Sequence, residues 1–294
     1  MTRVFRQKIA RQTAEAFLRE EGITDLPVDP LAIAESRDIV VEGKPEKADG
    51  VSGMLLRHGN NFGIIYATHI PSVGFQRFSI SHELGHYFLP GHLDHILPAD
   101  GAHVSRAGFV TADPYELEAD HFAAGLLMPE KPFKKEMDRH NLGLDAIAAV
   151  AEVCLTSHTA TAIRFAELSD MAVAVIMSTG GVIDYCFLSD AMKSLPKLAW
   201  LRKGTSLPAG TATTDLARAP ARVLAGERVD DTVDVRDWLG GEKRAFVTEE
   251  SIGLGKYGKV LTVLTSRSIG QEDSPDEDDE EEDLIESWTP RFQK

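Results

Sequence analysis

The sequence predicts an α+β protein in which helices and short strands follow one another without internal repeats. Two observations support this prediction. Apolar residues recur at helical spacing in several segments, and strand-like segments are separated by turns that contain Gly or Asn. With 294 residues, 43% of them hydrophobic, the chain is long enough for two or three domains, each with its own core.

Residues 1–135 are predicted to form the first α+β domain. Ile9, Ala14 and Phe17 share one face of a helix over residues 6–21. Gly22, Pro90-Gly91 and Pro129 mark where helices end. The other predicted elements are a short helix at 31–36, a strand at 38–42, a hairpin of 51–56 and 62–67, and helices at about 74–89 and 113–128.

Residues 136–169 are predicted to form a helix-turn-helix-like pair. A helix that reads DNA normally brings several cations to the groove, but the second helix of this pair brings only Arg164 and no lysine. We therefore expect the pair to pack on the first domain, and direct DNA binding is not expected. Residues 170–268 are predicted to form a mixed α/β domain that could act as a sensor. Its strands are expected at 171–178, 182–188, 244–248 and 259–265.

The charge of the chain is concentrated in a predicted acidic tail, residues 269–294. The chain carries 31 Lys and Arg against 46 Asp and Glu, a net charge of −15, and eleven of the acids lie within 272–286. Such a segment cannot bury enough apolar surface to order itself. The rest of the chain keeps a net charge of about −4, which argues against a general nucleic-acid binder.

The cysteines and the apolar segments predict a cytoplasmic protein. Cys154 and Cys186 are the only cysteines, too few for a disulfide framework or a four-cysteine zinc site. The longest apolar runs, such as residues 171–177, are far shorter than a membrane span. We expect both cysteines to be small buried residues in a reducing compartment, and we expect no membrane partner.

The residues most informative about chemistry are His82, Glu83 and His86, an H-E-x-x-H pattern on the predicted helix 74–89. Because the two histidines are four residues apart, their imidazoles lie on one face of the helix and can share a zinc ion. Glu83 can reach a water at the metal and accept its proton as a general base. The competing interpretation is a solvated surface helix, but apolar neighbours such as Leu84 and Phe88 argue against it.

A zinc site of this type needs a third protein ligand. We rank Glu116 first, because it shares a helix face with the small Ala119, and this allows close packing on the motif helix. Asp120, one turn further, would then accept a hydrogen bond from a ligating histidine in the second coordination shell. Glu118 is the alternative ligand. His92 has the spacing of a third histidine ligand, but Leu89 replaces the glycine of that motif, so we place His92 at the rim. We expect only surface or capping roles for His58, His69, His103 and His121.

These residues resemble a known family. The stretch from Arg77 to Pro129 contains R-F-S-I-S-H-E-L-G-H and then E-L-E-A-D-H-F-A-A-G-L-L-M-P, which is similar to the ImmA/IrrE family of intracellular zinc metallopeptidases. The resemblance covers about residues 1–168. It implies a gluzincin-type, zincin-like metallopeptidase domain with zinc on His82, His86 and Glu116 and with Glu83 catalytic. It also implies a GAF-like sensor domain after a helix-turn-helix segment.

The function that the resemblance implies is site-specific cleavage of a helix-turn-helix transcriptional repressor in a stress or mobile-element response. The chain would then be a cytoplasmic zinc metalloendopeptidase, a hydrolase that regulates transcription through this protein substrate. The alternative is a non-catalytic protein that keeps its metal for structure and regulates a DNA-binding partner by binding it. The sequence leaves open which repressor is cleaved and whether zinc, manganese or another ion is used.

Overall fold

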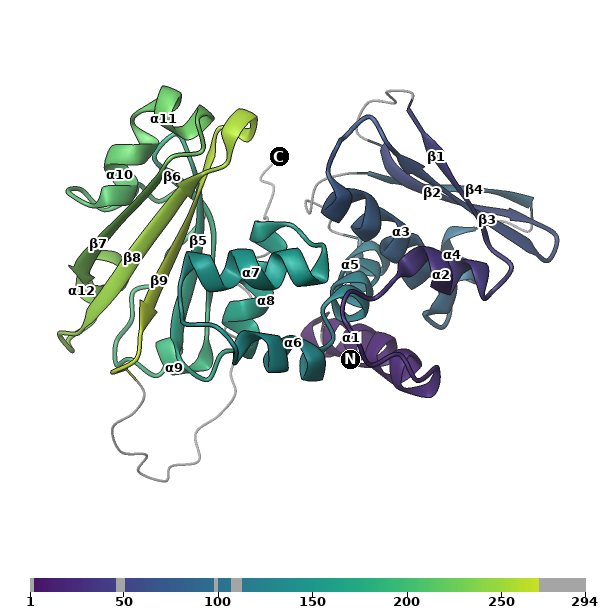
Figure 1. Ribbon diagram of the computed structural model, residues 1–294, viewed down its shortest axis with the longest axis horizontal. Coiled ribbons are helices and arrows are strands. Elements are labelled where there is room, and N and C mark those ends of the chain that lie inside the picture. Colours follow the sequence, from purple (N-terminus) through teal and green to yellow (C-terminus); the bar gives the residue numbers. More distant parts are fainter. Residues whose placement is uncertain (1–2, 46–50, 98–99, 107–112, 270–294) are drawn as a thin grey trace. The chain divides into compact units, whose positions relative to one another are not determined.

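The computed structural model describes residues 3–45, 51–97, 100–106 and 113–269 (Figure 1). These residues form two compact units, one of residues 3–136 with 150–157 and the other of residues 137–149 with 158–269. Both units mix helices with a sheet, so the predicted α+β class is confirmed. The acidic tail predicted at 269–294 lies, apart from its first residue, outside the described residues.

The first unit packs helices against one face of a four-stranded sheet. Its helices are α1 (Arg3–Glu20), α2 (Pro30–Glu35), α3 (Val73–Phe88), α4 (His92–Ile96), α5 (Pro114–Leu127) and α6 (Glu130–Met137). Its strands are β1 (Val40–Lys44), β2 (Val51–His58), β3 (Asn61–Ala67) and β4 (Asp100–Arg106), in the order β1-β3-β2-β4. Only β1 and β3 are parallel, and β2–β3 is the predicted hairpin, with Gly59 at φ 59° in its turn.

Helix α3 is central to the first unit, because it contacts β2 and β3 on one side and α5 on the other. Ser72 caps the start of α3 by accepting a hydrogen bond from the Phe75 N–H, and the backbone turns to an extended conformation at Leu89. Residues 79–86 are buried without interruption, which explains why this segment shows no polar face. Its Ile80 and Leu84 join an apolar cluster that also contains Leu55, Ile64, Phe122 and Leu126.

The close approach of α3 and α5 depends on small residues. A side chain at Gly85 would place its Cβ 3.0 Å from the Cα of Ala119 and 3.2 Å from the Cβ of Phe122. Ala119 and Ala123 are fully buried, as expected from the alanines of the predicted second helix. Asp113 starts α5 by accepting a hydrogen bond from the Tyr115 N–H, with Pro114 in the first turn. The two helices are therefore near enough for their side chains to share a site.

The second unit is built on a five-stranded antiparallel sheet in the order β6-β5-β9-β8-β7. Its strands are β5 (Ala172–Thr179), β6 (Val182–Leu188), β7 (Arg228–Asp234), β8 (Phe246–Gly253) and β9 (Lys259–Ser266). Glu249 contacts α10 and Glu250 contacts the start of α7, so these helices cover opposite faces of the sheet. The helices are α8 (His158–Leu168), α9 (Asp190–Lys193), α10 (Ala212–Ala217), α11 (Pro220–Leu224), α12 (Val235–Leu239) and the 3-10 turn η1 (Gly255–Tyr257). Helix α7 (Leu144–Cys154) begins in this unit, and its residues 150–154 belong to the first unit.

Two strands were not predicted, β4 and β7, and both lie at an edge of their sheets. Their sequences are D-G-A-H-V-S-R and R-V-D-D-T-V-D, in which the residues that face the protein are few, small or polar. Since an edge strand is paired on one side only, it does not need the apolar run that reveals a central strand. Strand β8 begins two residues later than predicted and extends to Gly253. The second half of the strand was not predicted because it contains several polar residues and no apolar run.

Helices α7 and α8 correspond to the predicted pair at 136–169. Leu155 adopts φ 53° in the turn between them, and Cys154 before it is fully buried, as expected. Arg164, the only cation of α8, is buried and pairs with Glu167 at 3.4 Å. This environment makes Arg164 a poor candidate for contact with a phosphate backbone, although the absence of DNA binding stays a prediction.

No single helix among the described residues has the length and apolar character of a membrane span. The α7–α8 pair reaches that length and composition only when both helices are taken together, and it is bent by 109°.

Candidate metal centre

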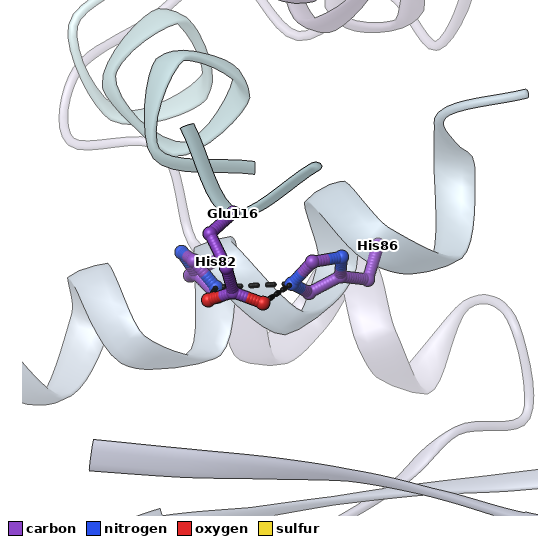
Figure 2. Close-up of side chains that lie close together, drawn as sticks. All are labelled: His82, His86 and Glu116. Atoms are coloured by element: carbon purple, nitrogen blue, oxygen red, sulfur yellow. Dashed lines mark hydrogen bonds and ion pairs between the residues drawn. The ribbon is translucent and has the colours of Figure 1, made fainter. Parts of the chain in front are cut away.

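Three side chains from α3 and α5 converge on one point (Figure 2). The Nε2 atoms of His82 and His86 are 3.1 Å apart. Each lies 3.3 Å from a carboxylate oxygen of Glu116. In a tetrahedral zinc site with bonds of 2.0–2.1 Å, neighbouring ligand atoms are about 3.3 Å apart. The spacing of the two nitrogens and the Glu116 carboxylate therefore fits a zinc ion held by three residues, with its fourth position open.

The charges around this point favour a cation. His82 Nδ1 lies 2.9 Å from Asp120 Oδ1, so Nδ1 donates to the carboxylate, and Nε2 would offer its lone pair to a metal that replaces its proton. Burial alone would lower the pKa of His82, but hydrogen bonds with Asp120 and Glu116 raise it to about 10. Burial would likewise raise the pKa of Glu116, but His103, His82 and His86 hold it well below its usual range. Two imidazole nitrogens and a carboxylate that face one point are a typical set of zinc ligands.

Glu83 lies beside the cluster in an unusual environment. Its side chain is fully buried, and neither carboxylate oxygen has a hydrogen-bond partner among the described residues. Burial raises its pKa to about 7, although His82 and the nearby Ser105 act in the opposite direction. A Cβ at Gly53 of β2 would lie 2.5 Å from Glu83 Oε1, so the glycine provides the space for this carboxylate. A buried carboxylate without a partner is costly unless another group uses it, and a water at the metal would do so.

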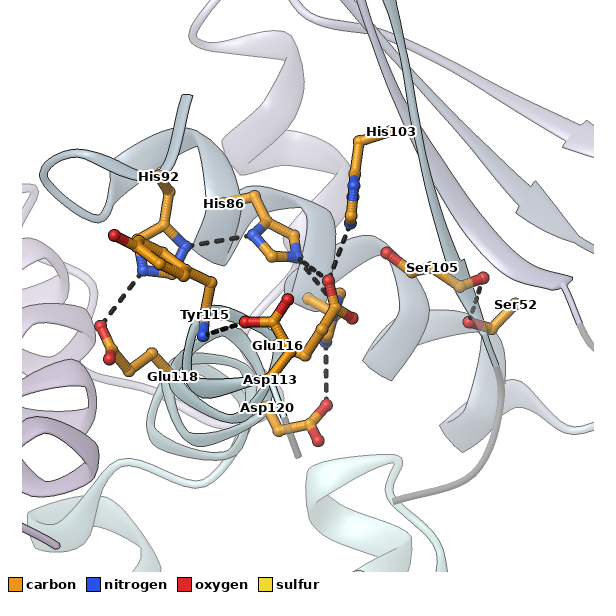
Figure 3. A network of polar contacts seen from close by, with 11 residues as sticks. Ser52, His86, His92, His103, Ser105, Asp113, Tyr115, Glu116, Glu118 and Asp120 are labelled. Atoms are coloured by element: carbon orange, nitrogen blue, oxygen red, sulfur yellow. Dashed lines mark hydrogen bonds and ion pairs between the residues drawn. The ribbon is translucent and has the colours of Figure 1, made fainter. Parts of the chain in front are cut away.

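The two alternative third ligands are held away from the converging point (Figure 3). His92 is fully buried, and its Nδ1 lies 3.1 Å from Nδ1 of His86, on the side of that ring opposite Nε2. The expectation that His92 sits at the rim was therefore wrong, because α4 turns its ring inward. Glu118 faces away from the cluster, with Oε2 3.2 Å from His92 Nε2 and Oε1 2.5 Å from Arg6 Nε.

Comparison with known proteins agrees with the motif and its geometry. Residues 34–157 match the Peptidase_M78 family model, described as the IrrE N-terminal-like domain. Residues 34–157 therefore form an IrrE N-terminal-like domain, which supports membership of the ImmA/IrrE family. The matched region contains both α3 and α5, and therefore all three converging side chains. The predicted resemblance is confirmed at this level.

Among solved structures, a Mycobacterium tuberculosis transcriptional regulator is similar to this chain. The two have a TM-score of 0.57 and 16% sequence identity, over 88% of this chain and 76% of that chain. At this identity the similarity shows the fold alone. A search of curated protein sequences gives no match.

His103 is a site residue that sequence analysis missed. It lies on β4, and its Nε2 is 2.8 Å from Glu116 Oε1 (Figure 3). The expected surface or capping role was wrong, because His103 and Ser105 alternate toward the inner face of the edge strand. The signal in the sequence was the i, i+2 spacing of these two polar residues, which is typical of one face of a strand. The strand was not predicted because its other residues do not form an apolar run. In this ImmA/IrrE domain His103 can donate to Glu116 and hold its carboxylate toward the histidines.

Asp120 occupies the predicted place beside His82, and its role in metal binding leads to a testable expectation. In Asp120→Ala we expect zinc affinity to fall about 10- to 100-fold, the usual cost of losing a partner that orients a ligating histidine. Asp120→Asn keeps an acceptor oxygen and is expected to lie between this variant and wild type. Chelator competition measures the affinities, and Asp94→Ala, an exposed change on α4, is the control. Equal affinity in Asp120→Ala and wild type would contradict the role.

Proposed function

We propose that this chain is a zinc-dependent endopeptidase that cleaves a helix-turn-helix transcriptional repressor at a specific site. The observation that supports it best is the buried, unpartnered carboxylate of Glu83 beside the converging atoms of His82, His86 and Glu116. A site kept for structure alone would gain nothing from a buried carboxylate without a partner. The ImmA/IrrE membership supports the same reaction.

In amide hydrolysis, three residues would bind the metal and a fourth, Glu83, would transfer the proton. His82, His86 and Glu116 would hold the zinc ion, which supplies Lewis acidity toward the scissile carbonyl and the attacking water. Glu83 accepts the proton of that water on a carboxylate oxygen and later donates it to the leaving nitrogen. The low polarity around Glu83 strengthens this proton transfer, since burial disfavours its charged form.

A peptide substrate is consistent with the strand beside the centre. Among the described strands β4 is an edge of its sheet, and it carries His103 next to Glu116. An edge strand presents unpaired backbone groups along its outer side, so an extended segment of a protein substrate can add to it as a further strand. This pairing would select extended chain rather than an intact helix.

The second unit is proposed to be a GAF-like sensor domain over about residues 170–268. Its support is a five-stranded antiparallel sheet with helices on both faces and an open pocket of about 430 Å³. Thr232, Thr248 and Thr265 form a row across β7, β8 and β9 in this pocket, with Glu250 and Arg267 nearby. We propose that the protein acts in the cytoplasm of the cell, where both free cysteines stay reduced.

Cleavage of a repressor encoded beside this chain is the test of the proposed function. We expect the wild-type protein loaded with zinc to cut that repressor at one site and to leave casein-like unfolded proteins almost untouched. Selectivity of this kind comes from contacts outside the catalytic centre. Co-expression followed by mass spectrometry of the fragments measures the outcome.

Two results would change this conclusion. Rapid digestion of unrelated unfolded proteins would indicate a general peptidase and overturn the regulatory role. No cleavage of any candidate repressor, with zinc bound and Glu83 intact, would favour the alternative of a non-catalytic protein that regulates a DNA-binding partner by binding it.

A further inference from the structure

A series of polar contacts, buried at its two histidines and partly exposed at its far end, leads away from the metal centre. Nδ1 of His86 lies 3.1 Å from Nδ1 of His92. Nε2 of His92 lies 3.2 Å from Glu118 Oε2, and Glu118 Oε1 is 2.5 Å from the Nε of Arg6. Figure 3 shows the His86, His92 and Glu118 side chains of this series, which come from α3, α4 and α5. Arg6 comes from α1, and both histidines are fully buried.

The direction of each hydrogen bond follows from the last members. Glu118 forms an ion pair with the guanidinium of Arg6, and a carboxylate can only accept hydrogen bonds. Nε2 of His92 must therefore carry the proton in their hydrogen bond. A neutral imidazole has one N–H, so Nδ1 of His92 is left with a lone pair and accepts from Nδ1–H of His86. The remaining nitrogen of His86, Nε2, then presents its lone pair toward His82 and Glu116.

The position of His92 is itself held by its surroundings. Its ring meets the Tyr115 ring edge-on at 5.0 Å, and Arg6 lies over the same Tyr115 ring at 5.3 Å. The ring of His92 is therefore clamped between Glu118, Tyr115 and His86. A histidine placed only to fill space would not need a partner on each of its two nitrogens.

We propose that His92 is a positioning residue that sets the tautomer and orientation of His86 for metal binding. The proposal rests on the metal centre of the proposed function and adds a residue that the H-E-x-x-H motif does not contain. His82 is held by the carboxylate of Asp120, whereas His86 is held by a second histidine that is polarised by Glu118 and Arg6. The two ligands are thus oriented by different chemistry.

Two substitutions at one position separate this role from packing. His92→Leu fills similar space without a polar atom, and we expect its zinc affinity to fall about 10- to 100-fold. His92→Asn returns an acceptor oxygen near the place of Nδ1, and we expect it to recover most of that loss. Asp94→Asn, an exposed change on the same short helix, is the control and should bind zinc as wild type does. Chelator competition gives the affinities, and circular dichroism of the metal-free proteins checks the fold.

A measurement on the unmodified protein gives a second test that needs no variant. Long-range ¹H–¹⁵N correlation NMR of the zinc-loaded chain, labelled at histidine, reports which nitrogen of each ring carries the proton. We expect the Nε2–H form for His92 and the Nδ1–H form for His86. A ring of His92 protonated on Nδ1, or equal zinc affinity in His92→Leu and wild type, would overturn the proposal while leaving the metal centre intact. Absence of zinc binding by the wild-type chain would overturn both.

Discussion

Replacing both His82 and His86 with alanine is expected to remove zinc binding entirely, from one ion per chain to none. The two Nε2 atoms are 3.1 Å apart and, with Glu116, supply all the protein atoms that converge on the centre among the described residues. A single remaining carboxylate cannot hold zinc at the affinity of a three-ligand site. Metal analysis after dialysis measures the stoichiometry.

The third ligand is tested in the same assay. Glu116→Ala is expected to lose the ion, whereas His92→Ala should retain it at saturating zinc with lower affinity. His58→Ala, at the exposed end of β2, is the control for loss of a histidine as such. Unchanged stoichiometry in the double variant would refute the assigned site. Zinc retained in Glu116→Ala but lost in His92→Ala would favour the other ligand set.

Glu83→Gln is expected to lower the rate of repressor cleavage by at least about 10²- to 10⁴-fold, the usual contribution of a positioned general base. The amide keeps the size of the side chain but cannot accept the proton of the attacking water. Because Glu83 is not one of the converging ligands, zinc content should stay at one ion per chain. Single-turnover cleavage and metal analysis of the same sample measure the two quantities.

The variant also separates the two functional classes. Glu83→Gln should still bind the repressor without cutting it, and Glu35→Gln, an exposed change on α2, should cut at the wild-type rate. If the Gln variant regulates its partner as well as wild type does, catalysis is not the function and the binding-protein alternative holds. If the Glu83→Gln variant loses zinc, the loss of metal alone explains slower cleavage, and the assignment of Glu83 as a general base that does not bind the metal is wrong.

The motif helix shows how far local sequence carries the prediction. The helix expected at about 74–89 is α3 at Val73–Phe88, because helical spacing and the breaker Pro90-Gly91 are local signals. The i, i+4 placement of His82 and His86 follows from helix geometry alone. The same holds for the hairpin β2–β3, whose turn residues stand in the sequence. These features need no knowledge of what packs against them.

The choice of the third ligand, in contrast, depends on how α5 packs against α3. Glu116 and Glu118 stand two residues apart on one helix, so the rotation of α5 decides which of them faces α3. That rotation is set by the contact of Gly85 with Ala119. It directs Glu116 to the histidines and Glu118 to Arg6 and His92. The preference for Glu116 over Glu118 rested on the small residues of α5, and these are the residues that make the contact.

The sequence by itself determined the motif helix, the pair of histidines and the carboxylate between them, because these lie within one turn of one helix. Only the tertiary structure decided that His103 reaches Glu116 from an edge strand and that His92 turns inward behind His86. It also decided that Gly53 leaves room for Glu83. The physical reason is the same in each case. These contacts join residues from different elements, and their geometry depends on how strand and helix pack, which no local spacing encodes.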